Sequence, residues 1–300
     1  MSGDDAQLTI VRACLRDGEG GSPTAVMEET PLSDDERRRV PALMGTSHAV
    51  FVSAHDGADG PVARLRFFTA EGELPACGHG TIAALAFLAE RAERAEHRTT
   101  LHTPGGAFAG RAVREEDHIT ASFDTGPVDL REATATECDL VLPALGVTPD
   151  ILAPGARTAA LGRPRLLIPV ATRSAVAALD PDLERLRAAC DRLGLLGCYV
   201  YSVPEPSGRA AARMFAPSIG VPEDVANANS TACLAAHLAD QRLTGVTVDM
   251  GDSLGSPSTI SAAARPGSPG GLVRLCGAAR IEHVLHTDRL LRSEPGNRPG

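Results

Sequence analysis

An internal repeat constrains the fold of this 300-residue chain more than any other feature. Residues 66–68 read R-F-F, and a polar loop then leads to Thr81 and an Ala-rich segment. Residues 213–215 read R-M-F, and a second polar loop leads to Thr231 and another Ala-rich segment. Each half therefore reads as a strand, a loop and a helix of small residues. Chance similarity between Ala-rich segments is one explanation of the repeat. The other is a duplication, which implies two similar β-rich domains, each with one buried central helix.

Hydrophobic periodicity predicts the elements of an α+β fold. Strands are expected at residues 8–15, 48–53, 62–68, 100–103, 107–113, 118–123, 198–203, 210–215, 246–250, 258–264 and 272–285. Helices are expected after the capping box Ser33–Glu36, with its end disturbed by Pro41, and at Thr81–Glu96, 180–193 and Asn229–Leu243. We divide the chain into an N-terminal half (1–125), a C-terminal half (126–285) whose last strands can return to the first, and a frayed tail (286–300).

Charge and composition exclude several classes of function. The net charge of -9 argues against a nucleic-acid partner, which needs clustered basic residues. All 29 basic residues are Arg, so no Schiff base can form. Lysine-linked pyridoxal phosphate enzymes, class I aldolases and P-loop enzymes are therefore excluded.

The expected compartment is the cytoplasm. The first residues are polar and acidic, so we expect no signal peptide, and no apolar run approaches the roughly 20 residues of a membrane span. Seven cysteines without regular spacing do not suit a disulfide framework and indicate reduced thiols. Five of them are expected to be small core residues: Cys14, Cys138, Cys190, Cys198 and Cys276.

Cys77 and His79 lie between glycines where the first central helix is expected to start. They can be read as metal ligands, as a nucleophile and its base, as a proton-transfer pair, or as an ordinary turn. A zinc site is a weak reading because it needs three or four ligands and neither C-x-x-C nor H-E-x-x-H occurs. A serine hydrolase is also disfavoured, because residues 45–49 lack the last Gly of a nucleophile elbow. The pair His283 and His286 reads as a solvated surface pair.

Two helix starts that face each other would bind a carboxylate without Lys or metal, since helix starts carry unpaired N–H groups and partial positive charge. Gly78 and Gly80 let the backbone approach a ligand closely. Asn229 and Ser230 offer side-chain donors at the second start. Acid–base groups at these positions could move protons at carbon near the bound carboxylate.

The sequence resembles the PhzF family of isomerases, which share the diaminopimelate-epimerase fold. The segments that carry the resemblance are G-S-P-T-A-V (21–26), E-L-P-A-C-G-H (73–79), R-M-F-A-P (213–217), E-D-V-A-N-A-N (223–229) and G-S-P-S (255–258). They cover nearly the whole chain, and C-G-H-G-T also resembles the proline racemases of the same fold. The resemblance implies two pseudo-symmetric β-rich domains, each wrapped around a central helix, with the active site in the cleft between them. It also implies a homodimer, which is usual in the family.

The departures from the family pattern concern the proposed chemistry. His79 and Asp224 match the family, but His48 stands where the family has the Glu that shuttles a proton. Asn229 stands at the family's Ser, which argues against the family's usual isomerisation of dihydro-hydroxyanthranilate. Racemases of this fold use a Cys at each helix start. Here Cys77 aligns through the repeat with Asn227, which suits a one-sided proton shift better than inversion.

We therefore expect a cofactor-independent isomerase, with no metal, that moves a proton and a double bond in a small, cyclic, carboxylate-bearing intermediate. A proline- or pyrroline-like ring and a role in antibiotic biosynthesis are suggested by analogy. The expected catalytic residues are His79, Asp224 and His48, and the expected substrate-binding residues are Cys77, Gly78, Gly80, Ser47, Asn229 and Ser230. The alternatives are an amino-acid racemase or epimerase that uses Cys77, and a relative that binds a small molecule without catalysis.

Overall fold

The computed structural model describes residues 7–265 and 272–286. In its first half, a closed ring of strands surrounds one helix. Around the ring, neighbours pair in the order β1-β2-β3-β4-β6-β7-β8-β17, and β17 pairs again with β1. The elements of this half are β1 (Gln7–Leu15), β2 (Ser22–Glu28), α1 (Asp34–Met44), β3 (His48–Gly57), β4 (Gly60–Thr69), β5 (Gly72–Leu74), α2 (Gly78–Ala92), β6 (Glu96–Thr103), β7 (Gly106–Arg114) and β8 (Ile119–Asp124).

The second half repeats this plan around α6. Its strands pair in the order β9-β10-β11-β12-β13-β15-β16-β17. The elements are β9 (Asp129–Glu132), α3 (Ala135–Leu145), β10 (Arg157–Leu161), β11 (Arg163–Val170), α4 (Arg173–Ala177), α5 (Leu183–Leu193), β12 (Cys198–Ser202), β13 (Arg209–Ala216), the 3-10 turn η1 (Pro217–Ile219), β14 (Val221–Asp224), α6 (Ala228–Ala239), β15 (Gly245–Met250), the 3-10 turn η2 (Asp252–Leu254), β16 (Ser258–Ala264) and β17 (Val273–His286).

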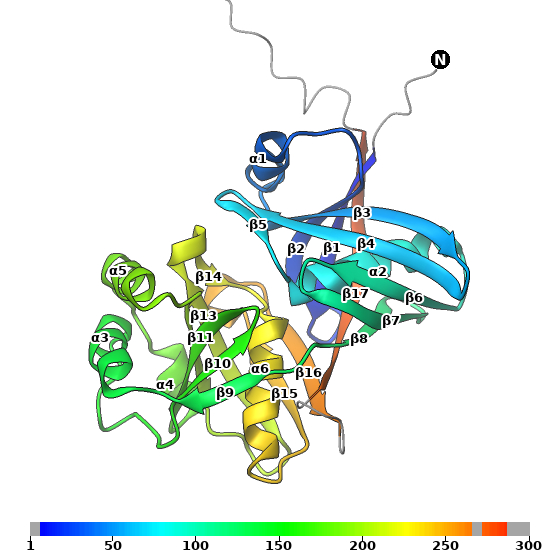
Figure 1. Cartoon of the computed structure of the whole chain (residues 1–300). Coiled ribbons are helices and arrows are strands. Elements are labelled where there is room, and N and C mark those ends of the chain that lie inside the picture. Colours follow the sequence, from blue (N-terminus) through cyan, green and yellow to red (C-terminus); the bar gives the residue numbers. More distant parts are fainter. Residues whose placement is uncertain (1–6, 266–271, 287–300) are drawn as a thin grey trace, which may run out of the picture.

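The strand pairings confirm that the repeat in the sequence is a structural repeat. The parallel pairs β2–β3 and β4–β6 of the first half correspond to β11–β12 and β13–β15 of the second. The hairpin β4–β5 before α2 corresponds to β13–β14 before α6. Figure 1 shows the two halves as two lobes, with α2 among the strands of one and α6 in the other, while β17 extends along both. The predicted fold, two pseudo-symmetric β-rich units around central helices, is confirmed.

The repeat extends to individual side chains. Arg66 pairs with Glu73 and stacks over the ring of Phe68 at 5.0 Å. Arg213 pairs with Glu223 and stacks over Phe215 at 4.8 Å. In each half, the arginine therefore links the last long strand before the central helix to the short strand that follows it.

The surrounding strands explain why both central helices consist of small residues. Every residue of α2 from Gly78 to Ala89 is buried, and α6 is buried from Ala228 to Leu238. A helix enclosed on all sides leaves no polar face, and small side chains let the strands approach its axis.

The predicted helix bounds need correction. The α2 helix begins at Gly78 rather than Thr81 and ends at Ala92 rather than Glu96, because Glu93 turns into the left-handed region (φ 50°) and Glu96 already pairs with Val113 in the sheet. The α6 helix likewise ends at Ala239 rather than Leu243. At the end of α2, strand pairing thus overrides helix propensity.

Helix α1 also differs from expectation at its end. The predicted capping box is present, since Ser33 accepts a hydrogen bond from the backbone of Glu36 while Glu36 reaches back. Pro41 was expected to disturb the end of the helix, but the helix continues to Met44 and closes on the left-handed Gly45. Of the five cysteines expected in the core, Cys138 and Cys276 are only half-buried.

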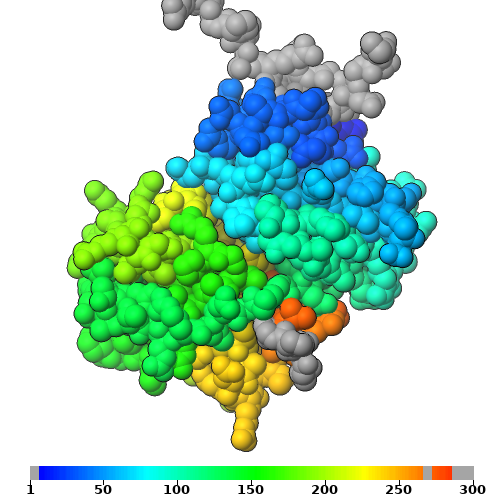
Figure 2. All heavy atoms as spheres, viewed as in Figure 1, coloured from blue at the N-terminus to red at the C-terminus, as the bar shows by residue number. Residues whose placement is uncertain are grey.

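The site must lie where the lobes meet, since the repeat places the starts of both central helices there. Figure 2 shows that the blue-to-cyan lobe and the green-to-yellow lobe touch along a seam. None of the helices in the described parts of the chain is long and apolar enough to span a membrane. The predicted frayed tail lies beyond the described residues, except for His286.

Candidate active site

A small cavity of about 40 Å³ lies between the two halves. Its wall includes polar side chains from both lobes: His48, Cys77 and His79 from the first, and Arg165, Asp224 and Asn227 from the second. A molecule bound there would contact both lobes.

The starts of α2 and α6 meet at this cavity. A Cβ atom built on Gly78 would lie 2.6 Å from Cβ of Ala228 and 3.0 Å from the backbone nitrogen of Asn229. Real Cβ atoms do not approach other atoms so closely, so only glycine fits at the first residue of α2. Two partial positive charges consequently face one space, which favours an anion between them.

Each helix start is built in the same way. Cys77 is the N-cap of α2 and Asn227 is the N-cap of α6. The Thr81 hydroxyl donates to the carbonyl of Cys77 at 2.8 Å, and the Thr231 hydroxyl donates to that of Asn227 at 3.0 Å. The alignment of Cys77 with Asn227 therefore holds in three dimensions, and Cys233 lies further along, buried within α6.

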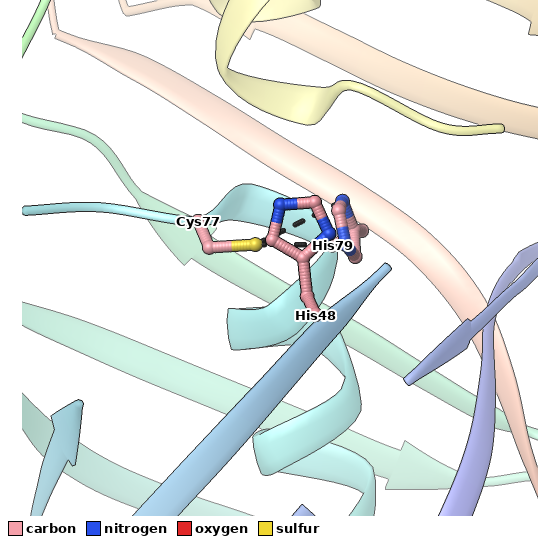
Figure 3. Close-up of side chains that lie close together, drawn as sticks. All are labelled: His48, Cys77 and His79. Atoms are coloured by element: carbon pink, nitrogen blue, oxygen red, sulfur yellow. Dashed lines mark hydrogen bonds between the residues drawn. The ribbon is translucent and has the colours of Figure 1, made fainter. Parts of the chain in front are cut away.

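His48, Cys77 and His79 form one buried cluster, in which the ligand atoms lie within 4.8 Å of one another. The ring of His48 meets the ring of His79 edge to face, with centroids 4.5 Å apart. The sulfur of Cys77 lies 3.5 Å from Nε2 of His79. Figure 3 shows these three side chains converging at the start of α2. Ser47 lies behind the cluster, with its hydroxyl 2.8 Å from Nδ1 of His48, and so orients that ring.

Asp224 brings the second half into contact with this cluster. Its Oδ2 atom lies 3.9 Å from Nδ1 of His79 and accepts a hydrogen bond of 2.9 Å from the Asn227 amide. Its Oδ1 atom is buried and has no hydrogen-bond partner among the described residues. His79 and Asp224, 145 positions apart in the chain, thus lie side by side as the repeat predicted.

The two imidazoles have opposite pKa shifts. Burial lowers the pKa of His48 well below its usual range, and the charge of His79 adds to this effect. Burial also acts to lower the pKa of His79, but the charges of Cys77 and Asp224, together with hydrogen bonds that His79 donates to Cys77 and to the backbone of Ala226, raise it to about 9. Burial raises the pKa of Asp224, although His79 and Asn227 oppose this shift. At neutral pH the site therefore pairs a neutral imidazole with a protonated one.

The same cluster offers one sulfur and two ring nitrogens to a metal ion. Those donors would suit zinc, but a structural zinc site has four ligands and a catalytic one has three that are deprotonated. The pKa of about 9 places a proton on His79 at neutral pH. This proton suits an acid–base site, and a metal ion bound by the three side chains would have to displace it.

The structure places the predicted site residues in two layers. Six line the cavity: His48, Cys77, Gly78, His79, Asp224 and Asn229. Ser47, Gly80 and Ser230 do not belong to its wall. Gly80 packs against Val50 and Phe67, and the backbone N–H of Ser230 donates to Asn227.

Sequence reasoning missed Arg165 and the contact of Asn227 with Asp224. Nothing in the sequence pattern distinguishes Arg165 from the other arginines, because its position depends on how β11 passes under α6. Asn227 was noted only as the replacement of a cysteine, although an Asn just before a helix is an ordinary cap signal that could have been used.

Comparison with known proteins places this geometry in a family. The model of phenazine biosynthesis-like proteins, named PhzC-PhzF, matches residues 16–282. A trans-2,3-dihydro-3-hydroxyanthranilate isomerase from Pseudomonas fluorescens is 30% identical over 258 residues, which cover 81% of this chain and 85% of that protein. An uncharacterised isomerase from Escherichia coli K12 is 26% identical over 222 residues, which cover 73% and 74% of the two chains.

Solved structures share the fold. A predicted epimerase from Pseudomonas aeruginosa superimposes with a TM-score of 0.80 and covers 96% of this chain and all of its own, at 24% identity. At that identity the likeness establishes the arrangement of the two lobes around their central helices.

Proposed function

The chain belongs to the PhzC-PhzF family and is an isomerase of that family, and we propose that it moves a proton and a double bond within a small cyclic carboxylate without a cofactor. The observation that carries the proposal is the pair His48 and His79, which meet in the cavity with opposite pKa shifts. A neutral imidazole can take a proton from carbon, and a protonated one can deliver a proton.

In the proposed reaction His48 removes a proton from one ring carbon. The electrons of the broken C–H bond form a new double bond, the original double bond shifts, and a proton is added at a second carbon. His79 is the acid near that second carbon, and Asp224 supports its charged form. The facing starts of α2 and α6 hold the carboxylate.

The replacement of the family's Glu by His48 supports a substrate different from that of the Pseudomonas fluorescens relative. An imidazole is neutral where a carboxylate is charged, so His48 does not repel an anion bound beside it. The substrate class we propose is a carboxylate on a five- or six-membered ring, of the kind made in the biosynthesis of secondary metabolites.

Racemisation through Cys77 is the second candidate. Cys77 lies beside His79 at the start of α2, where its sulfur faces the cavity wall shared with Asp224. The residue at the opposite helix start is Asn227, whose amide does not titrate. A two-base inversion would therefore lack its second base, and this favours the isomerase.

Proton transfer in heavy water tests the proposal. The purified protein is incubated with a panel of unsaturated cyclic carboxylates, including trans-2,3-dihydro-3-hydroxyanthranilate, and followed by ultraviolet absorption, optical rotation and mass spectrometry. An isomerase changes the ultraviolet spectrum and incorporates deuterium at carbon. A racemase changes the optical rotation without changing the spectrum. Binding without deuterium exchange for every compound would identify a non-catalytic relative.

A further inference from the structure

A fully buried arginine lines the cavity and has no acidic partner among the residues that the structure describes. Arg165, on β11, is 1% exposed and belongs to the wall of the site. Within the described residues its guanidinium donates only to neutral groups: the Ser230 hydroxyl at 3.2 Å and the carbonyls of Leu161 and Arg163, each at 3.0 Å. Its Nε atom is buried and has no hydrogen-bond partner there. Buried charges are normally paired, so this cation needs an anion that the protein itself does not provide.

The charges around the cavity point to the same requirement. The wall contains Arg163, Arg165 and the protonated His79, against one carboxylate, that of Asp224. Asp224 is engaged with His79 and Asn227 through its Oδ2 atom. The two helix starts add partial positive charge to the same space.

The charged groups are also divided between the lobes. The imidazoles of His48 and His79 belong to the first half, whereas Arg163 and Arg165 belong to the second, on β11. A molecule bound between the lobes with its anionic group toward β11 and α6 would turn its remaining carbons toward the imidazoles.

We propose that Arg165 is a specificity-determining residue that binds the carboxylate of the substrate through its guanidinium and thereby orients the ring toward His48 and His79. This inference rests on the proposed function for the identity of the reacting carbons. The carboxylate contact itself does not depend on turnover. The Ser230 hydroxyl and the carbonyls of Leu161 and Arg163 hold the guanidinium in place from behind.

The test measures equilibrium binding of benzoate and of its uncharged isostere benzamide by calorimetry, with no turnover required. The wild-type protein is expected to prefer benzoate, and Arg165→Met is expected to reduce this preference by roughly 10- to 100-fold, the range for a hydrogen bond to a charged group. Arg165→Lys keeps the charge but not the planar guanidinium and should retain part of the preference. Arg157→Met is the matched control, since Arg157 lies on the neighbouring strand β10, pairs with Glu132 and does not line the cavity.

Several outcomes would overturn the inference. They are equal affinity of the wild-type protein for benzoate and benzamide, no measurable binding of benzoate, and an unchanged preference in Arg165→Met. If Arg165→Met does not fold, the inference is tested by the preference for benzoate over benzamide in the wild-type protein and in Arg165→Lys. Failure of deuterium exchange together with a lost preference in Arg165→Met would refute the proposed isomerase and leave the carboxylate site standing. Deuterium exchange together with an unchanged preference for benzoate in Arg165→Met would refute the carboxylate site and leave the proposed isomerase standing.

Discussion

At the scale of single residues, His48 and His79 show how surroundings separate two identical side chains. Both are almost fully buried, and their rings touch. His48 faces a neighbouring cation and a neutral hydroxyl, so burial dominates and its pKa falls. His79 lies between Cys77 and Asp224, which outweigh burial and raise its pKa to about 9. Their different roles in the proposed reaction follow from these neighbours.

Substitution His48→Ala should remove most proton transfer while the protein stays folded. General acid–base groups contribute about 10²–10⁴-fold, so the rate of deuterium incorporation should fall within that range. His48→Gln should be no better because an amide does not titrate. His55→Ala is the control, since His55 is an exposed residue of the same strand. A rate for His48→Ala equal to that of the wild type would make His48 a packing residue.

The raised pKa of His79 predicts a dependence of stability on pH. The folded state keeps the proton up to about pH 9, whereas the unfolded chain releases it near pH 6.5, so this contribution is complete below pH 6.5 and is lost as pH rises to 9. The shift corresponds to roughly 3 kcal/mol of unfolding free energy. Urea unfolding between pH 6 and about 9.5 measures it, with His79→Gln as the reference. If the unfolding free energies of the wild type and of His79→Gln changed equally with pH, the raised pKa of His79 would be contradicted.

At the scale of elements, the central helices bring the site together because they are packed start to start. Small residues allow the strands to enclose each helix, and Gly78 allows the start of α2 to reach the start of α6. The caps Cys77 and Asn227 occupy equivalent positions in the two halves but carry different chemistry. The duplicated elements thus build a symmetric frame around an asymmetric set of side chains.

Gly78→Ala should push the two helix starts apart. The added methyl group would overlap Ala228 and Asn229, and overpacking of this kind costs typically about 1–3 kcal/mol. We expect both a lower unfolding free energy and weaker binding of benzoate, measured by urea unfolding and calorimetry. Gly245→Ala is the matched control, because a Cβ there meets its nearest atom at 3.6 Å, an ordinary contact. If Gly78→Ala and Gly245→Ala have the same unfolding free energy and the same affinity for benzoate, the close approach of the helix starts is not needed for stability or binding.

At the scale of the whole molecule, the site belongs to neither lobe alone. The cluster of His48, Cys77 and His79 comes from the first half, whereas Arg165 and Asp224 come from the second. Strand β17 pairs with strands of both halves. In the proposed reaction, the acid, the base and the anion-binding groups are all side chains or backbone of this chain.

The activity should survive removal of metal ions. The proposed acid and base are side chains of this chain, and a metal ion at the His48–Cys77–His79 cluster would have to displace the proton of His79. After dialysis against EDTA, the rate of deuterium incorporation should be unchanged, with the metal content checked by mass spectrometry. Loss of activity on chelation, restored by one defined metal, would replace this mechanism with a metal-dependent one.

The sequence by itself determined the architecture and part of the site. Periodicity predicted most strands and helices. The repeat predicted that His79 and Asp224 would lie together, because both lie near the starts of the central helices, which meet at the cleft between the two halves. The ends of α2 and α6 could not be predicted, since strand pairing at Glu96 and the left-handed Glu93 ended the first of these helices. Local propensity carries no information about such distant partners.

Only the tertiary structure decided the electrostatics of the site. The pattern could place His48 at the family's Glu position but not its pKa, which depends on burial and on the ring of His79. Arg165 carried no signal, because an arginine without an acidic partner is recognised only once its surroundings are known. Residue types and spacing determine which groups can meet, whereas distance and desolvation, which act through space, decide what those groups do.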